Sequence, residues 1–113
     1  MNNLVKINNS DLSVKEFNGQ RVVTFKDIDR LHERVEGTAK RNFNDNKKHF
    51  IEGIDYFLIT KSEVGTDFVL SFEFDKFAAA GTLITESGYL MLVKSLSDDL
   101  AWTVQRELVN KYF

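Results

Sequence analysis

The chain has 113 residues, a formal net charge of −2 and no cysteine. This length corresponds to one domain, and 42% hydrophobic residues, with ten phenylalanines in the chain, are enough for a buried core. The lack of cysteine excludes disulfides, thiolate nucleophiles and zinc–thiolate sites. No stretch approaches the roughly 18 apolar residues of a membrane span, and the first residues lack the apolar run of a signal peptide. We therefore expect a cytoplasmic protein that does not enter membranes.

The N-terminal part predicts short β-structure. Residues 1–12 are polar at first and indicate a flexible terminus or an edge strand around Leu4 to Ile7. Asn18-Gly19 lies between two β-prone runs, and Asn-Gly is a strong hairpin signal because both turn positions need positive φ. We expect strands at 13–17 and 20–24, and a single folded domain over residues 13–113.

A helix is expected to start after Thr24, which can cap it together with Asp27. Its buried stripe is expected to be formed by Ile28, Leu31 and Val35. Glu36-Gly37 interrupts this pattern, and glycine is favoured in the left-handed position after a helix. Thr38 can cap a second helix after a turn of a few residues. Residues 24–50 therefore read as a helix-turn-helix.

The second predicted helix, 38–50, has two distinct faces. At 3.6 residues per turn, Ala39, Phe43 and Phe50 share one side. The adjoining side is basic and polar: Lys40, Arg41, Asn44, Lys47 and Lys48. A helix docked by one flank and offering these groups on the other has what is needed to read a DNA major groove. The alternative is that this face is simply an ordinary helix surface exposed to solvent. The sequence pI of about 5.7 argues mildly against DNA binding.

Residues 51–84 predict a wing-like pair of strands. Residues 55–60 read as one strand, 62–67 as a loop, and 68–74 as a second strand because their apolar residues alternate. A further short strand is expected at 83–84. Together these elements predict an α+β fold: an N-terminal β-hairpin, a helix-turn-helix with wing-like strands, and two C-terminal helices.

The two C-terminal helices are expected to begin at capping residues. Thr85 can cap the first, which carries Leu90, Val93 and Leu96 at helical spacing. Ser97 can cap the second, in which Leu100, Val104 and Leu108 form one stripe and Trp102 is expected in the core. Acidic Asp98 and Asp99 suit the start of that helix.

No pattern in the chain indicates catalysis. His32 and His49 are the only histidines, and His32 on the first helix is better explained by packing than by metal binding. There is no G-x-S-x-G motif and no glycine-rich phosphate loop. We therefore expect no enzyme activity, no metal and no cofactor.

Three stretches together resemble one family. They are FNGQRVVTF, KRNFNDNKKHFIEGIDYF and LITESGYLMLVKSLSDDLAWTVQRELVNKYF. They look like the phage and prophage "ORF six N-terminal" domain, a relative of the KilA-N and Bro-N domains of phage antirepressors. The resemblance implies a DNA-binding regulatory domain. It also implies that the domain reads DNA through the segment that contains Asn42, Phe43, Asn44 and Asn46. Residues on the family's second motif are expected to be mainly structural: Thr85, Glu86, Gly88, Lys94, Ser95, Leu96 and Trp102.

The predicted function is therefore a phage-type, antirepressor-like transcription regulator that binds double-stranded DNA. The DNA-binding residues are expected to be Thr38, Lys40, Arg41, Asn42, Asn44, Lys47 and Lys48. Arg41 and Asn44 suit base edges, the lysines suit phosphate, and the helix start near Thr38 could hold a phosphate through free N–H groups. Asn42 and Asn46 could equally satisfy backbone groups at the turn and the helix end. Two further expectations are a homodimer, because one short helix reads few bases, and, as the alternative function, a module that binds a phage repressor.

Overall fold

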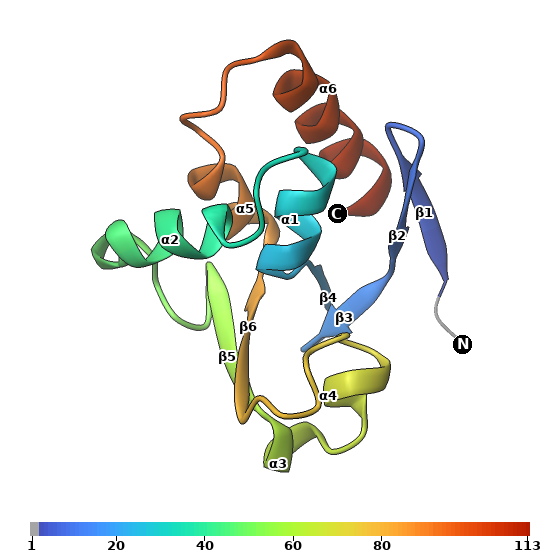
Figure 1. Ribbon diagram of the computed structural model, residues 1–113, viewed down its shortest axis with the longest axis vertical. Helices are drawn as coiled ribbons and strands as arrows, with labels where there is room; N and C mark the ends of the chain where they lie inside the picture. Colours follow the sequence, from blue (N-terminus) through green and yellow to red (C-terminus); the bar gives the residue numbers. More distant parts are fainter. Residues whose placement is uncertain (1–2) are drawn as a thin grey trace.

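The computed structural model describes residues 3–113 (Figure 1). Its N-terminal part contains two antiparallel hairpins. Strands β1 (Leu4–Ile7) and β2 (Ser10–Ser13) form the first, and β3 (Lys15–Phe17) and β4 (Gln20–Val22) form the second. Asn18 and Gly19 have φ values of 52° and 77°, which confirms the predicted Asn-Gly turn. The predicted edge strand is also present, and it is one arm of a hairpin that the sequence did not indicate.

Helix α1 (Phe25–Leu31) begins with the predicted capping box, in which Thr24 and Asp27 each bond the other's backbone N–H. Its predicted end was wrong. Glu33 has a φ of 54°, and the Arg34 N–H bonds back to the Asp29 carbonyl at 2.8 Å. This left-handed termination ends the helix well before Gly37.

The connection between the first two helices is consequently longer than expected, because it spans residues 32–37. Val35 lies in this connection with 81% of its surface exposed, so its predicted place in the buried stripe was wrong. Gly37 is not the residue after α1. With a φ of 99°, it directly precedes α2 (Thr38–Asp45).

The strand pair beyond α2 is formed by β5 (Tyr56–Thr60) and β6 (Ala80–Ile84), which run antiparallel. An isolated bridge from Val23 to Ile84 joins this pair to the end of β4. Residues 68–74 are not a strand, and 62–67 are not a simple loop. The chain between β5 and β6 instead forms two single-turn helices, α3 (Lys61–Val64) and α4 (Asp67–Leu70). The predicted wing-like pairing of 55–60 with 68–74 was therefore wrong, because β5 pairs with β6 instead.

The C-terminal part contains α5 (Glu86–Leu92) and α6 (Asp99–Glu107), followed by a π-helical turn over Leu108–Tyr112. Thr85 caps α5 as predicted, by accepting from the Gly88 N–H. The cap of α6 is Asp98 rather than Ser97, because its carboxylate accepts from the Ala101 N–H at 2.8 Å. Trp102 is 66% exposed, so the prediction of a core tryptophan was wrong.

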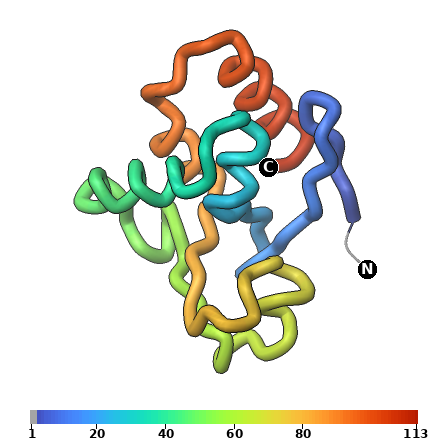
Figure 2. Tube along the Cα trace, viewed as in Figure 1, coloured from blue at the N-terminus to red at the C-terminus, as the bar shows by residue number. Residues whose placement is uncertain are grey.

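The main core joins the N-terminal hairpins, α1, α2 and the C-terminal helices. A smaller cluster holds the α4 region against β4, β5 and β6, around Phe68 and Phe72. Figure 2 shows the end of the chain lying beside the first hairpins. There the buried Tyr112 hydroxyl accepts from the Lys15 N–H at 2.9 Å and donates to the Val22 carbonyl at 2.6 Å. The core thus positions α2 at one edge of the molecule, between α5 and β5 in Figure 1.

Candidate nucleic-acid interface

Helix α2 is attached to the core by one face, as its sequence predicted. Ala39 is 5% exposed and Phe43 3%. The Phe43 ring lies 4.9 to 5.3 Å from the rings of Phe25, Phe50 and Tyr56, measured between centroids. Such aromatic pairs each contribute about 0.5–1.5 kcal/mol beyond the stabilisation that comes from removing the ring from water. Phe43 is therefore the main hydrophobic anchor of the helix.

The start of α2 is held by an acid on the preceding helix. The buried carboxylate of Asp29 accepts from the backbone N–H of Gly37 at 2.8 Å and from that of Ala39 at 2.9 Å. Capping by Thr38 was a wrong prediction. Thr38 is the first helical residue, and its hydroxyl donates to the Val35 carbonyl.

The predicted phosphate site at the start of α2 has no free backbone N–H group at residues 37–39. The N–H groups of Gly37, Thr38 and Ala39 all have partners within the protein. An anionic side chain, Asp29, already occupies the position that a phosphate would take. A phosphate there would have to displace it.

The exposed side of α2 carries Lys40, Arg41 and Asn44. Within residues 3–113, none of these three side chains makes a hydrogen bond or an ion pair. Asp45 lies next to them at the helix end. The helix therefore presents two cations and an amide to solvent on a fixed support.

Helix α2 ends at Asp45, earlier than the predicted 38–50. A 3₁₀ turn, η1 (Lys47–His49), follows after Asn46, which closes α2 through its backbone N–H. The change of direction comes where Phe50 returns to the core in extended conformation. Lys47 and Lys48 are exposed, as predicted, but they lie on this turn rather than on the helix.

Asn42 and Asn46 have structural bonds. The Asn42 amide donates to the Leu92 carbonyl on α5 at 2.8 Å, and its oxygen accepts from the Asn46 amide at 2.9 Å. Asn46 also bonds the Asn42 backbone carbonyl. Both asparagines therefore bond backbone carbonyls, as the alternative interpretation expected. Asn42 fastens the middle of α2 to the end of α5.

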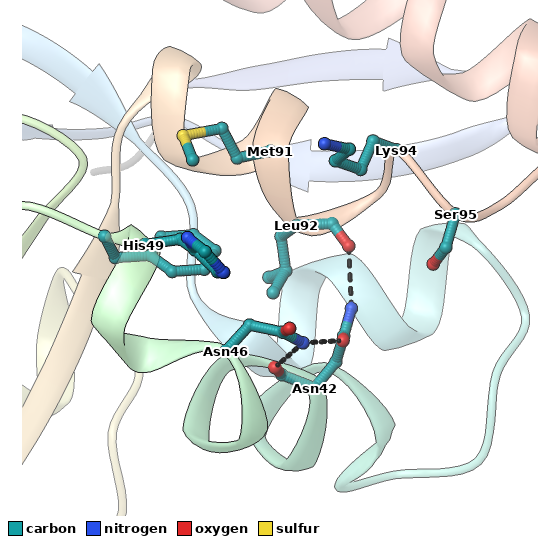
Figure 3. A pocket seen from close by; sticks show the side chains of 8 residues that line it. Asn42, Asn46, His49, Met91, Leu92, Lys94 and Ser95 are labelled. Atoms are coloured by element: carbon teal, nitrogen blue, oxygen red, sulfur yellow. Dashed lines mark hydrogen bonds between the residues drawn. The ribbon is translucent and has the colours of Figure 1, made fainter.

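A pocket of about 400 Å³ lies where α2 and η1 meet the end of α5 (Figure 3). Leu92 and Phe50 are its buried apolar part. His49 lies on one side and Lys94 and Ser95 on the other. Lys94 and Ser95 were expected to be structural, but both are exposed and neither side chain has a bonded partner among the described residues. In the sequence they fall between Val93 and Leu96, two of the apolar positions at helical spacing, and that placement was the available signal for their exposure.

A second pocket, of about 510 Å³, lies on the other flank of α2. Its charged lining is mixed: Lys26, Lys40, Asp29, Glu36, Glu73 and Asp75. The segment between β5 and β6 is also more acidic than basic, since Lys61 and Lys76 stand against Glu63, Asp67, Glu73 and Asp75. The positive character of this side of the molecule is therefore concentrated on α2, η1 and the end of α5.

His32 is buried at the end of α1, beside Tyr89 of α5. Its Nε2 lies 2.7 Å from the Tyr89 hydroxyl, and its Nδ1 is the buried side-chain atom without a partner within residues 3–113. Burial, with a smaller contribution from Arg34, lowers the pKa of His32 from 6.5 to about 4. Burial also raises the pKa of Tyr89. Both groups thus stay neutral and belong to the core packing that was expected for His32.

Within residues 3–113, no group of three or more His, Cys, Asp or Glu side chains is placed to hold a metal ion. No helix in the described part of the chain has the length and apolar character needed to cross a membrane.

Comparison with known proteins identifies one family. The family model of the ORF6N domain matches residues 12–95, which is most of the chain. This agrees with the resemblance noted in the sequence. No curated protein and no solved structure matches the chain.

Proposed function

The chain belongs to the ORF6N domain family, and from this premise we propose that it is a phage-type DNA-binding regulatory domain that reads the major groove with α2. In this proposal it acts by binding, as an antirepressor-like regulator of transcription, and not as an enzyme. The partner is double-stranded DNA. A homodimer would place two copies of α2 on one site, as helix-turn-helix dimers do.

The observation that supports the proposal most is the one-sided attachment of α2. Phe43 and Ala39 fix the helix to the core, Asp29 holds its start, and Asn42 ties its middle to α5. Lys40 and Arg41 remain in solvent without partners inside the described chain. A helix fixed in this way has little backbone conformational entropy to lose on entering a groove.

The proposed roles follow from side-chain chemistry. Arg41 can bind guanine through two hydrogen bonds, and Asn44 can bind adenine in the same way. Lys40, Lys47 and Lys48 are suited to phosphates, which position a protein on DNA without reading sequence. Thr38, at the first turn, has its hydroxyl bonded to Val35 and is the weakest candidate. Asn42 is proposed to contribute indirectly, by holding α2 in position through its bond to Leu92.

The test is fluorescence anisotropy of labelled duplex DNA titrated with the protein at several salt concentrations. Affinity should fall with rising salt, with a log–log slope of about −0.9 per phosphate contacted. Arg41→Ala should weaken binding, whereas Arg106→Ala should not, because Arg106 is an exposed arginine on α6, away from α2. A folded protein that binds no duplex at low salt would refute the proposal.

A second candidate function is binding to a protein such as a phage repressor. It is favoured by large apolar side chains that the described fold leaves exposed, among them Phe77 at 85% and Trp102 at 66%, and by the net charge of −2. Covering such side chains with a protein partner would remove apolar surface from water, which is favourable. Capture of a purified repressor at high salt, with no DNA binding at low salt, would favour this candidate.

A further inference from the structure

We propose that the pocket between η1 and the end of α5 holds a backbone phosphate of the DNA through Lys94 and Ser95. The inference rests on the DNA-binding function proposed above and adds a contact outside the helix-turn-helix. It also fixes how DNA lies on the protein, because the sugar–phosphate backbone would pass along the α5 side of α2.

The first support is that Lys94 and Ser95 have no role in the fold itself. Both are exposed, and within residues 3–113 neither side chain forms a hydrogen bond or an ion pair. Their backbone is nevertheless anchored, because it directly follows Val93, which is 1% exposed. Figure 3 shows the two side chains along one side of the pocket, opposite His49.

The second support is the rigid link between this pocket and α2. The hydrogen bond of 2.8 Å from the Asn42 amide to the Leu92 carbonyl joins the two helices. Leu92 stands only two residues before Lys94. A phosphate bound at Lys94 would therefore be held at a set distance from Arg41 and Asn44, as a contact that sets register must be.

The third support is the difference in charge between the two flanks of α2. Among the described residues, Lys94 and His49 line the pocket at α5 and no acidic residue does. The pocket on the opposite flank contains four carboxylates, those of Asp29, Glu36, Glu73 and Asp75, against Lys26 and Lys40. A backbone with one negative charge per phosphate is attracted to the first flank and repelled by most of the second.

The chemistry of the pocket suits a phosphate diester. Lys94 supplies a cation on a flexible stem, and the Ser95 hydroxyl can donate one hydrogen bond to a phosphate oxygen. The buried Leu92 and Phe50 leave room for the sugar beside it. Lys47 and Lys48 on the adjoining turn can meet the neighbouring phosphates of the same strand.

The experiment measures the salt dependence of duplex binding for single variants. Lys94→Ala should make the log–log slope less steep by about 0.9, the change for one phosphate contact, and Lys94→Arg should restore it. Ser95→Ala should weaken binding roughly five-fold, the effect of one hydrogen bond, without changing the slope. Lys26→Ala, on the opposite flank, is the matched control and should leave the slope unchanged.

The outcomes separate this inference from the proposed function. The phosphate site is overturned if the wild-type protein binds DNA but Lys94→Ala has the same salt-dependence slope as the wild type. It is also overturned if Lys26→Ala makes that slope less steep by the same amount as Lys94→Ala. In either case α2 can still be the helix that reads DNA. If the folded wild type binds no duplex at any salt concentration, the DNA-binding function itself fails. Circular dichroism should show unchanged folding for every variant, because none of these side chains has a partner in the described structure.

Discussion

Asp29 on α1 accepts a hydrogen bond of 2.9 Å from the backbone N–H of Ala39 on α2. The same carboxylate accepts from the Gly37 N–H at 2.8 Å. One side chain therefore caps a helix that begins nine residues after it, and the two helices of the pair cannot turn independently. Asp29 is 4% exposed, so removing its side chain leaves these N–H groups without their acceptor in a largely buried site.

Asp29→Ala should lower the free energy of unfolding by about 2 kcal/mol, because two N–H groups at the start of α2 lose their acceptor. DNA affinity should fall as well, since the orientation of α2 is loosened. Urea denaturation and anisotropy measure the two effects. Asp45→Ala, an exposed acid on α2 without a bonded partner among residues 3–113, should leave stability nearly unchanged. Equal effects of the two variants would mean that Asp29 does not hold the helix.

Gly88→Ala should be strongly destabilising. A Cβ atom at this position would overlap the backbone carbonyl oxygen of Asp55, and that carbonyl is fixed by bonds from the Thr85 N–H and hydroxyl. Backbone cannot move aside as a side chain can, so we expect a loss of about 3 kcal/mol or more. Thermal denaturation provides the measurement.

Glu86→Ala is the control for Gly88→Ala, because it introduces the same residue into the same turn of α5 at an exposed position. It should shift the melting temperature little. A normal melting temperature for Gly88→Ala would show that α5 can move away from Asp55.

Lys15→Met tests a buried ion pair. The Lys15 side chain is 0% exposed, and its Nζ lies 3.0 Å from Asp27 Oδ2 and 3.2 Å from Glu73 Oε1. Removing the cation leaves the buried Asp27 carboxylate with its hydrogen bond from the Thr24 N–H but without a counter-charge, so we expect a loss of about 3 kcal/mol in unfolding free energy.

The chain offers a matched comparison for this variant. Lys6 and Asp11 form a lysine–aspartate pair on the first hairpin at 3.4 Å, but both side chains are more than half exposed. Lys6→Met should cost less than about 1 kcal/mol. Similar losses for the two variants would show that the buried pair contributes no more to the unfolding free energy than the exposed pair does.

The stability of the fold should depend on pH through His32. Its pKa is lowered to about 4 in the folded protein by burial, against 6.5 ordinarily. Between these values the unfolded chain binds a proton that the folded chain does not. The contribution of neutral His32 is therefore complete above pH 6.5 and is lost as the pH falls towards 4.

His32→Gln removes this titration while keeping a group that can bond Tyr89. Urea denaturation at pH 7 and pH 5 should show a smaller difference in unfolding free energy for the variant than for the wild type. The comparison at pH 7 measures the altered contact with Tyr89 separately. An undiminished difference in the variant would exclude His32 as the source.

The features that the sequence predicted well were those decided by neighbouring residues. Asn18-Gly19 specifies a turn because both residues tolerate positive φ, and both adopt it. Thr24 with Asp27, and Thr85, cap helices through contacts within one turn. The buried side of α2 followed from helical spacing alone, since Ala39 and Phe43 are in the core.

The features that it missed depend on contacts across the fold. Phe68 and Phe72 are four residues apart, so both a strand and a helical turn place them on one side. The structure buries both in the smaller cluster, with Leu70 70% exposed between them. Nothing local to Gly37 reveals that Asp29 caps it, and nothing local to Trp102 reveals that smaller residues on α6, Ala101 and Val104, take the core positions. The pocket between η1 and the end of α5 likewise could not be predicted, because it forms only where the fold places α5 beside η1.

Tyr112 has a consequence for where this domain can be cut. The family match ends at residue 95, yet Leu108 and Tyr112 are buried, and the Tyr112 hydroxyl bridges β3 and β4. A fragment trimmed to the matched segment would lose α6 and expose the apolar faces that it covers. The unit that folds is thus longer than the segment by which the family is recognised, and expression of a stable fragment should retain the chain through residue 113.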